Sequence, residues 1–367
     1  MGSGSTITAS VAQPASAAAP IRVMIVDDSL TVRAVLAKII APELGMVVVG
    51  KTGSAENALF DLAKSPADVV LLDLEMPGMG GLDALPRILA ANPGTQVLVV
   101  SSLTVAGAEH TLSALSMGAA DTMLKPRAGE FGDSYRSVLL AKIRALGHRS
   151  RAGGETAEIL PPPPLLARNS IGTPLEIVGI GASTGGIHAL CILLRQLPRK
   201  MAAPILVTQH LPAAFTPVFA RQLELASGRT AVMVGDGTAI ESGRIHIAPG
   251  DGHMILRRRA GRLSATTAAF KVASGCMPSV DPMFESMGDV AGGGALGVVL
   301  SGMGRDGAVG AASLVRAGGN VIAQDEESAS VWGMPRAIAE AGLASAILPP
   351  DKIALRIAAH AGEAAWT

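Results

Sequence analysis

Short apolar runs alternate with polar, helix-like stretches along the first part of the chain. The spacing between the runs leaves room for one helix after each predicted strand, which is typical of βα units and of a parallel sheet. We therefore predict one doubly wound α/β domain over residues 21–146. The predicted strands are IRVMIV (21–26), MVVVG (46–50), DVVLL (68–72), TQVLVVS (95–101) and DTMLK (121–125).

A second α/β series follows, and it predicts a second doubly wound domain over residues 175–362. Helix-like stretches separate most of its apolar runs, and no internal repeat is convincing. Its predicted strands are EIVGI (176–180), APILVTQ (203–209), AVMV (231–234), RIHIAP (244–249), GALGVVLS (294–301) and NVIAQ (320–324).

Two segments lack a usable hydrophobic period. Residues 147–174 are rich in Gly, Arg, Glu and Pro, and Pro161 to Pro164 form a stiff polyproline stretch, so this segment is predicted to be a flexible linker. Residues 1–20 contain no Lys or Arg and no continuous apolar core. They are predicted to be a disordered leader rather than a signal peptide.

Composition and charge narrow the range of partners. Hydrophobic residues make up 49% of the 367 residues and aromatic residues only 2%, so aliphatic side chains must build the cores. Thirty basic and thirty acidic residues balance, which predicts no general attraction to nucleic acid or anionic membranes. The sequence contains no run of about 18 apolar residues, so no membrane insertion is predicted. Cys191 and Cys276 lie far apart and suggest neither a disulfide framework nor a metal knuckle.

Polar side chains follow the predicted strands of the first domain. Asp27 and Asp28 come directly after one strand, Asp73 ends another, and Ser101 and Lys125 end the last two. Because the carboxyl ends of parallel strands share one edge, we expect these groups to lie together. Carboxylates gathered there suit Mg²⁺, and with a lysine and a hydroxyl they form a phosphoryl-acceptor site. Taken singly, each aspartate is better explained as a helix or turn cap, and only the whole set at the strand ends favours the site.

The motifs MIVDDSLTVR and VVLLDLEMPGMGGL, with the two strand-ending residues, give this region a resemblance to the receiver domain of two-component response regulators. The resemblance covers the full domain and implies a flavodoxin-like fold. It also implies phosphorylation of Asp73 by a histidine kinase, with Ser101 as the switch hydroxyl and Lys125 as the phosphate-binding lysine. The Mg²⁺ ligands that it implies are Asp27, Asp28, Asp73 and the backbone of Glu75.

Two positions depart from the usual receiver pattern. Gly80 stands where an aspartate is commoner, which alters the loop and not the acid pocket. Thr122 stands where many receivers carry an aromatic switch residue, so the usual rotamer readout is not expected here.

The stretch VGIGASTGG at residues 178–186 opens the second domain and allows three interpretations. As a dinucleotide fingerprint its glycine spacing is imperfect, and the acidic residue expected about 20 residues later is absent. As a nucleophile elbow it matches G-x-S-x-G and presents Ser183 at a helix N-terminus, where the helix dipole favours an oxyanion. The third interpretation is a plain tight turn.

Candidate partners for this serine also follow predicted strands. His210 follows PILVTQ, and Asp306 follows GALGVVLS, so both are expected at the same edge as Ser183. A Ser–His–Asp triad is recognised by geometry and not by chain order. Asp325, after NVIAQ, competes with Asp306 on sequence alone. The other histidines considered are His188, interpreted as structural, and His246 and His253, which flank IAPGDG and are candidates to line a cleft.

Six motifs in order then give the second domain a resemblance to the catalytic domain of the chemotaxis protein-glutamate methylesterases. They are IGASTGG, TQHLP, IAPGDGHM, PSVDPMFES, LSGMGRDGA and QDEESASVWGMPR. The resemblance implies a Rossmann-like three-layer hydrolase fold and a catalytic triad of Ser183, His210 and Asp306. It places Thr184 and the backbone N–H of Met303 near the oxyanion, and it implies no metal or other cofactor in this domain.

Together the two resemblances imply a cytoplasmic, phosphorylation-regulated serine hydrolase of the chemotaxis system. Its substrates would be glutamate γ-methyl esters of methylated chemoreceptors, with methanol released, and receptor glutamines are further candidate substrates. We hypothesise that the unphosphorylated receiver packs over the cleft and that phosphorylation of Asp73 weakens that packing. The alternatives are a response regulator whose second domain only docks to receptors, and a nicotinamide oxidoreductase.

Overall fold

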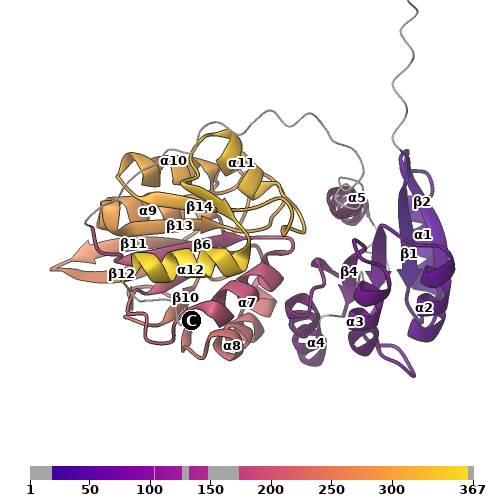
Figure 1. Cartoon of the computed structure of the whole chain (residues 1–367). Coiled ribbons are helices and arrows are strands. Elements are labelled where there is room, and N and C mark those ends of the chain that lie inside the picture. Colours follow the sequence, from indigo (N-terminus) through magenta and orange to yellow (C-terminus); the bar gives the residue numbers. More distant parts are fainter. Residues whose placement is uncertain (1–18, 103, 126–131, 148–172, 363–367) are drawn as a thin grey trace, which may run out of the picture.

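The computed structural model describes residues 19–102, 104–125, 132–147 and 173–362. The predicted leader over residues 1–20 and the predicted linker over residues 147–174 lie almost wholly outside these ranges. Figure 1 shows two α/β units, each built on a mainly parallel sheet, side by side. The prediction of two doubly wound parallel sheets is confirmed.

The first unit is a parallel sheet of five strands in the order β2-β1-β3-β4-β5, the flavodoxin-like order. Apolar side chains of α1 and α5 pack on one face, and those of α2, α3 and α4 pack on the other. The five predicted strands all form. The elements are β1 Ile21–Val26, α1 Leu30–Ile40, β2 Met46–Thr52, α2 Ala55–Lys64, β3 Val69–Leu72, α3 Gly81–Ala91, β4 Gln96–Ser101, α4 Val105–Ser116, β5 Asp121–Leu124 and α5 Asp133–Gly147.

The second unit is a parallel sheet of seven strands in the order β15-β14-β13-β6-β7-β10-β8. Helices α7, α8 and α12 cover one face, and α9, α10 and α11 cover the other, which gives three layers (Figure 1). The strands are β6 Ile177–Ala182, β7 Ile205–Gln209, β8 Ala231–Met233, β10 Ile245–Ile247, β13 Ala295–Val299, β14 Asn320–Gln324 and β15 Ala346–Leu348. The helices are α7 Gly186–Gln196, α8 Thr216–Ser227, α9 Val280–Ala291, α10 Ala308–Arg316, α11 Met334–Glu340 and α12 Pro350–His360.

Four strands escape the sequence prediction. Strand β15 is a short edge strand, and the other three form a separate antiparallel sheet from β9 Thr238–Ala239, β11 His253–Arg259 and β12 Arg262–Ala268. The strands of this antiparallel sheet carry Arg, Ser and Thr because one face of the sheet is exposed to solvent. They therefore lack the continuous apolar runs that mark the buried parallel strands.

The order of the second sheet brings three distant chain segments together. Strand β6 lies between β13 and β7, with Val299 paired to Gly181 and Ala182 paired to Gln209. The residues that follow these strands therefore leave the sheet from adjacent positions at its carboxyl edge, where open α/β sheets bind ligands. None of the helices in the described ranges has the length and apolarity needed to cross a membrane.

Helices α9 and α10 approach closely, and the contact needs a glycine. A Cβ atom at Gly310 would lie 2.4 Å from the backbone oxygen and 2.7 Å from the Cα atom of Asp281. The Gly310 N–H also donates a 2.8 Å hydrogen bond to Oδ1 of Asp281. This approach holds the start of α9 beside the loop that follows β13.

We expect Gly310→Ala to lower the free energy of unfolding by about 1–3 kcal/mol, because the added methyl group must push two helix backbones apart. The higher helix propensity of alanine offsets up to about 1 kcal/mol of this loss. Gly235→Ala is the matched control, since its Cβ would meet only the Thr238 hydroxyl at 3.8 Å. Urea denaturation followed by circular dichroism measures both, and equal midpoints would contradict the close approach.

Candidate active site

Ser183 lies in a tight turn between β6 and α7. Its N–H donates to the Ser301 carbonyl at 3.0 Å, and its carbonyl accepts from the Gly186 N–H at 2.9 Å. Gly185 has φ 76°, and a Cβ there would lie 2.4 Å from the Ser330 Cβ atom. Gly185 is therefore required both by its backbone conformation and by the close contact, and the turn presents a partly exposed Ser183 just before α7.

His210 follows the neighbouring strand β7 and lies at the same height along the sheet as Ser183. The parallel register pairs Ala182 with Gln209, so the next residues, Ser183 and His210, follow side by side at the carboxyl edge. The His210 N–H donates to the Ala182 carbonyl at 3.0 Å, which extends the strand pairing by one residue.

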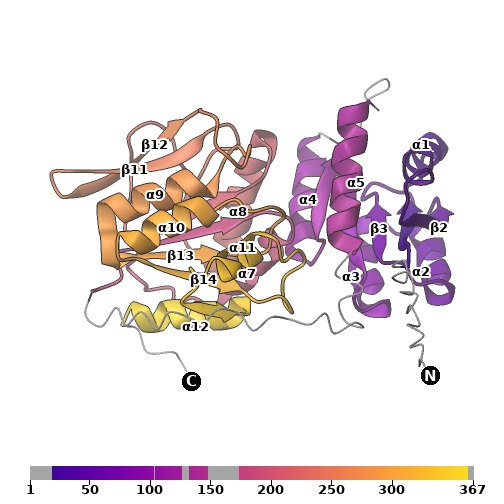
Figure 2. The same ribbon diagram turned by 90° about the horizontal axis from the view of Figure 1, so that it is seen from above.

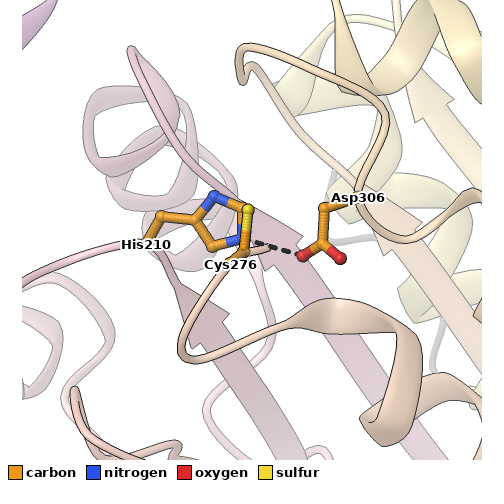
Figure 3. Close-up of side chains that lie close together, drawn as sticks. All are labelled: His210, Cys276 and Asp306. Atoms are coloured by element: carbon orange, nitrogen blue, oxygen red, sulfur yellow. Dashed lines mark hydrogen bonds and ion pairs between the residues drawn. The ribbon is translucent and has the colours of Figure 1, made fainter. Parts of the chain in front are cut away.

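Asp306 reaches the same place from the loop after β13, and it is only 1% exposed. Its Oδ2 atom lies 2.8 Å from Nε2 of His210 (Figure 3). The same oxygen accepts from the Val280 N–H at 2.7 Å, and Oδ1 accepts from the Ser279 hydroxyl at 2.6 Å. Three donors therefore hold this buried carboxylate, which is the arrangement that a buried charge requires.

The pairing shifts the pKa values of both groups. Burial by itself would lower the pKa of His210, but the hydrogen bond with Asp306 and the neighbouring Cys276 sulfur raise it to about 9. Burial would raise the pKa of Asp306, but the hydrogen bonds from His210, Ser279 and the Val280 N–H keep it below its ordinary value. The carboxylate is therefore charged, and the Nε2 atom carries the proton that it donates.

Within the described residues, Ser183 Oγ makes no hydrogen bond to His210. Since Nε2 is bonded to Asp306, the imidazole has Nδ1 left for a bond to the serine. Hydrogen bonds of catalytic groups are often long in structures without substrate. A Cβ at Gly302 would lie 2.9 Å from the Ser183 Cβ atom, so the loop after β13 packs directly on the serine.

The other candidates from the sequence occupy different places. Asp325 accepts from the Ser328 N–H at 3.0 Å, which makes it a local turn cap, and no hydrogen bond joins it to His210 in the described part of the chain. His246 and His253 are fully buried, so the expectation that they line a cleft is wrong. His253 links the Ser279 N–H and the Phe270 carbonyl, and the Nε2 atom of His246 accepts from a backbone N–H.

The two residues expected near the oxyanion lie on the loops that follow β6 and β13. The Thr184 hydroxyl is buried and donates to Oδ2 of Asp121, a residue of the first unit. Met303 is 41% exposed and lines a cavity of about 620 Å³ together with Asp306 and Cys276. Both residues are thus at the rim that carries Ser183, and their assignment to the oxyanion stays a prediction.

Sequence reasoning missed three residues of this site. Ser279 caps α9 and holds Asp306, while Asp281, two residues further in the first turn of α9, has a pKa raised by burial and by the charge of Asp306. The motif PSVDPMFES contains both, but nothing in its pattern indicates that they support a distant aspartate. Cys276 lies beside His210 and Asp306, although its distance from Cys191 in the sequence argued against a metal site.

The acidic residues of the first unit gather as expected. Carboxylate oxygens of Asp27, Asp28 and Asp73 lie within 4.8 Å of one another. The Lys125 Nζ atom lies 2.6 Å from Oδ2 of Asp73 and 3.1 Å from Oδ2 of Asp27. Burial raises the pKa of Asp73, and Lys125 only partly offsets this effect.

Two further residues complete this pocket. The Glu75 N–H donates to Oδ1 of Asp73 at 3.1 Å. The Ser101 hydroxyl is buried and has no hydrogen-bond partner among the described residues. A buried hydroxyl without a partner costs free energy, so this atom is poised to meet a group that enters the pocket.

The first unit packs against the serine loop of the second. Asp121 on β5 accepts from the Thr184 hydroxyl, and the Ala120 carbonyl accepts from the Gly185 N–H at 2.5 Å. Helix α4 lies against α7 and α8, with the His188 Nδ1 atom 2.9 Å from the Ser116 carbonyl oxygen (Figures 1 and 2). His188 is therefore structural, and it stabilises the contact between the units.

Comparison with known proteins gives matches over both units. A model of the CheB methylesterase family matches residues 178–357, and a model of the response regulator receiver domain matches residues 23–131. A relative from Paramagnetospirillum magneticum is 41% identical over 366 residues, which cover 93% of this chain and 96% of the relative. One from Caulobacter vibrioides is 45% identical over 345 residues, covering 93% and 99%. Both are named protein-glutamate methylesterase/protein-glutamine glutaminase.

Solved structures match the units separately. The CheB methylesterase catalytic domain of Thermotoga maritima is 36% identical, with a TM-score of 0.49, and the match covers 50% of this chain and 96% of that domain. The response regulator domain of Thermotoga maritima CheB is 38% identical, with a TM-score of 0.31, and covers 36% and 96%.

We expect Asp306→Asn to lower the pKa of His210 from about 9 toward its ordinary 6.5, because the charged acceptor is lost while burial remains. The raised pKa also means that the imidazolium stabilises the fold fully below pH 6.5 and that this contribution is lost as the pH rises through about 9. NMR titration of the ring protons in the presence of a chelator measures the pKa. Asp325→Asn should leave it unchanged, and the same pKa in both variants would contradict the pairing.

Proposed function

The chain belongs to the family of the protein-glutamate methylesterases/protein-glutamine glutaminases, and we propose that it hydrolyses glutamate γ-methyl esters on chemoreceptors. The observation that carries the proposal is the hydrogen bond between the buried Asp306 carboxylate and His210, beside Ser183 at the carboxyl edge of the sheet.

We propose domain limits of residues 21–146 for the receiver and 175–362 for the catalytic domain, joined by a linker over 147–174. Because the methylated helices of such receptors are cytoplasmic, we propose that the protein acts in the cytoplasm.

In the proposed reaction, Ser183 Oγ attacks the ester carbonyl carbon and gives its proton to the Nδ1 atom of His210. This atom is the base because Nε2 carries the proton donated to Asp306. It accepts only in the neutral ring, which the raised pKa of His210 makes the minor form below about pH 9. The imidazolium returns the proton to the methoxy oxygen, so methanol leaves and a glutamyl ester of Ser183 remains. Water then attacks this ester with the same base, which frees the glutamate carboxylate and the serine. A glutamine substrate follows the same steps, with ammonia as the leaving group.

The developing oxyanion needs donors on the rim. The candidates are Thr184 and the backbone N–H of Met303, on the loops after β6 and β13. Loss of one oxyanion donor typically costs about 10²–10³ in rate. The hydroxyl of Thr184 is bonded to Asp121 in this structure, so it must change partner before it can serve.

The receiver is proposed to accept a phosphoryl group on Asp73 from a chemotaxis histidine kinase. Its donor set fits Mg²⁺, since three carboxylates converge with oxygen atoms only. Asp27, Asp28, Asp73 and the backbone of Glu75 would hold the ion, which when bound neutralises charge on the transferred phosphoryl oxygens. Lys125 and the Ser101 hydroxyl, which has no hydrogen-bond partner among the described residues, would bind the phosphoryl oxygens.

A single strand links this pocket to the serine loop. Strand β5 carries Asp121 at its start, and Lys125 follows its last residue. Lys125 now pairs with Asp73, and Asp121 now binds Thr184. A phosphoryl group on Asp73 would draw Lys125 and Ser101 toward it and would displace the end of β5 that precedes Lys125. We therefore propose that the unphosphorylated receiver inhibits hydrolysis by covering the serine loop and by occupying the Thr184 hydroxyl.

We expect Ser183→Ala to reduce methanol release from methylated receptor by at least about 10⁴-fold, because the nucleophile is lost. Ser345→Ala is the matched control, since the Ser345 hydroxyl donates a hydrogen bond to the Val321 carbonyl at the amino edge of the sheet, away from Ser183. Methanol is measured from receptor-containing membranes that carry a labelled methyl group. Equal rates for wild type and Ser183→Ala would leave only a docking role for the domain.

We expect Asp121→Ala to raise the activity of the unphosphorylated full-length chain about tenfold. The reason is that a hydrogen bond to a charged group contributes about 1.5–3 kcal/mol, and tenfold corresponds to about 1.4 kcal/mol. A small-molecule phosphodonor should then add little, and Asp73→Asn should remove its effect on the wild-type chain. Glu109→Ala is the control within the same contact, because its pair with Arg221 is exposed. Basal rates unchanged in Asp121→Ala would contradict the role of the Thr184 contact.

A further inference from the structure

Three side chains that can bind metal ions meet at the proposed active site. His210 follows β7, Cys276 lies in the loop between β12 and α9, and Asp306 lies in the loop after β13 (Figure 3). One ligand atom from each residue lies within 4.8 Å of the other two. The proposed reaction uses the imidazole and the carboxylate but gives no task to the thiol.

We propose that His210, Cys276 and Asp306 form a binding site for a soft divalent cation, Zn²⁺, and that the bound cation switches hydrolysis off. The inhibition rests on the proposed function, but the site itself stands on the geometry of the three side chains.

The donor set is one that zinc prefers. Thiolate sulfur, imidazole nitrogen and carboxylate oxygen bind Zn²⁺ at about 2.3, 2.0 and 2.0 Å, which separates ligand atoms in a tetrahedral site by roughly 3.3–3.5 Å. The 2.8 Å contact between His210 Nε2 and Asp306 Oδ2 has to open slightly, and the Cys276 sulfur has to approach. Cys276 is partly exposed, and apart from this cluster its one side-chain hydrogen bond among the described residues is to the Ser274 carbonyl at 3.8 Å, so the sulfur has room to move.

The surroundings support a metal site. Ser279 Oγ and the Val280 N–H fix the Asp306 carboxylate, as groups around metal ligands commonly do. Cys276, Met303 and Asp306 line the same 620 Å³ cavity, which gives the cation a route from solvent and room for a water molecule as fourth ligand.

Coordination would disable the base through its tautomer. In the neutral ring, the form that acts as the base, Nε2 carries the proton donated to Asp306 and Nδ1 has the free electron pair. A cation on Nε2 takes the electron pair of that nitrogen, so the proton of the neutral ring must lie on Nδ1. The ring then has no electron pair for the proton of Ser183. The thiol proton passes to solvent as the sulfur binds, and Asp306 binds the cation in place of Nε2–H.

The acidic pocket of the receiver provides an internal comparison. Its ligands are carboxylate oxygens, which suit Mg²⁺, whereas a thiolate and an imidazole select Zn²⁺ over Mg²⁺. Saturating Mg²⁺ therefore fills the receiver pocket and leaves the proposed site free.

The first test uses Co²⁺ as a probe on the full-length chain in saturating Mg²⁺. A Co²⁺–thiolate bond gives a near-ultraviolet charge-transfer band that oxygen ligands do not give. We expect one equivalent of Co²⁺ to produce this band and Zn²⁺ to displace it. Cys276→Ser and Cys276→Ala should both lose the band, whereas Cys191→Ala should keep it, because Cys191 is buried in α7 away from the site.

The second test measures methanol release with and without Zn²⁺ in each variant and compares only the ratio. Loss of a group that supports a metal ligand weakens affinity about 10–100-fold, so loss of the thiolate itself should weaken Zn²⁺ by at least about 100-fold. We expect at least tenfold inhibition of the wild-type chain at a Zn²⁺ concentration that inhibits Cys276→Ser less than twofold.

The outcomes separate this inference from the proposed function. A band that depends on Cys276 in a chain without esterase activity would keep the metal site and overturn the function. Esterase activity without the band, or with equal Zn²⁺ inhibition in wild type and Cys276→Ser, would overturn the metal site.

Discussion

The adjacency of β13, β6 and β7 is the constraint on which the candidate site depends. Neighbouring parallel strands end at the same edge of the sheet, so the residues that follow them lie close together. Ser183, His210 and Asp306 come from segments separated by 27 and 96 residues along the chain, and the order of the strands alone makes them neighbours. The close passage of α9 over α10 at Gly310 then holds Ser279 against Asp306.

The buried carboxylate of Asp306 is the most demanding group within this frame. It is almost fully withdrawn from water, so it needs the donors that Ser279, Val280 and His210 supply. The same pairing sets the tautomer of His210 and raises its pKa. It also brings Cys276 into a cluster with two potential ligands, so one arrangement supports both the proposed hydrolysis and its proposed inhibition by zinc.

Coupling between the units follows from the place of β5. This strand is the edge of the first sheet, and it faces the serine loop of the second unit. Asp121 and Lys125 lie at its two ends, one on Thr184 and the other on Asp73. In the proposed coupling, this short strand would carry a change at Asp73 to the serine loop without an aromatic switch residue at Thr122.

The sequence by itself determined the parallel sheets, because buried strands must be continuous apolar runs at βα spacing, and it placed Asp73, Ser183 and His210 at strand ends. The antiparallel sheet of β9, β11 and β12, which is solvated on one face, lacks such runs and was not predicted. Residue spacing left Asp306 and Asp325 open, the family resemblance favoured Asp306, and the tertiary structure shows it bonded to His210. Only the tertiary structure brought Cys276 to the site and Asp121 to Thr184. These contacts join residues 63 to 96 positions apart, or loops without a local pattern, and depend on strand order and domain packing, which residue spacing does not encode.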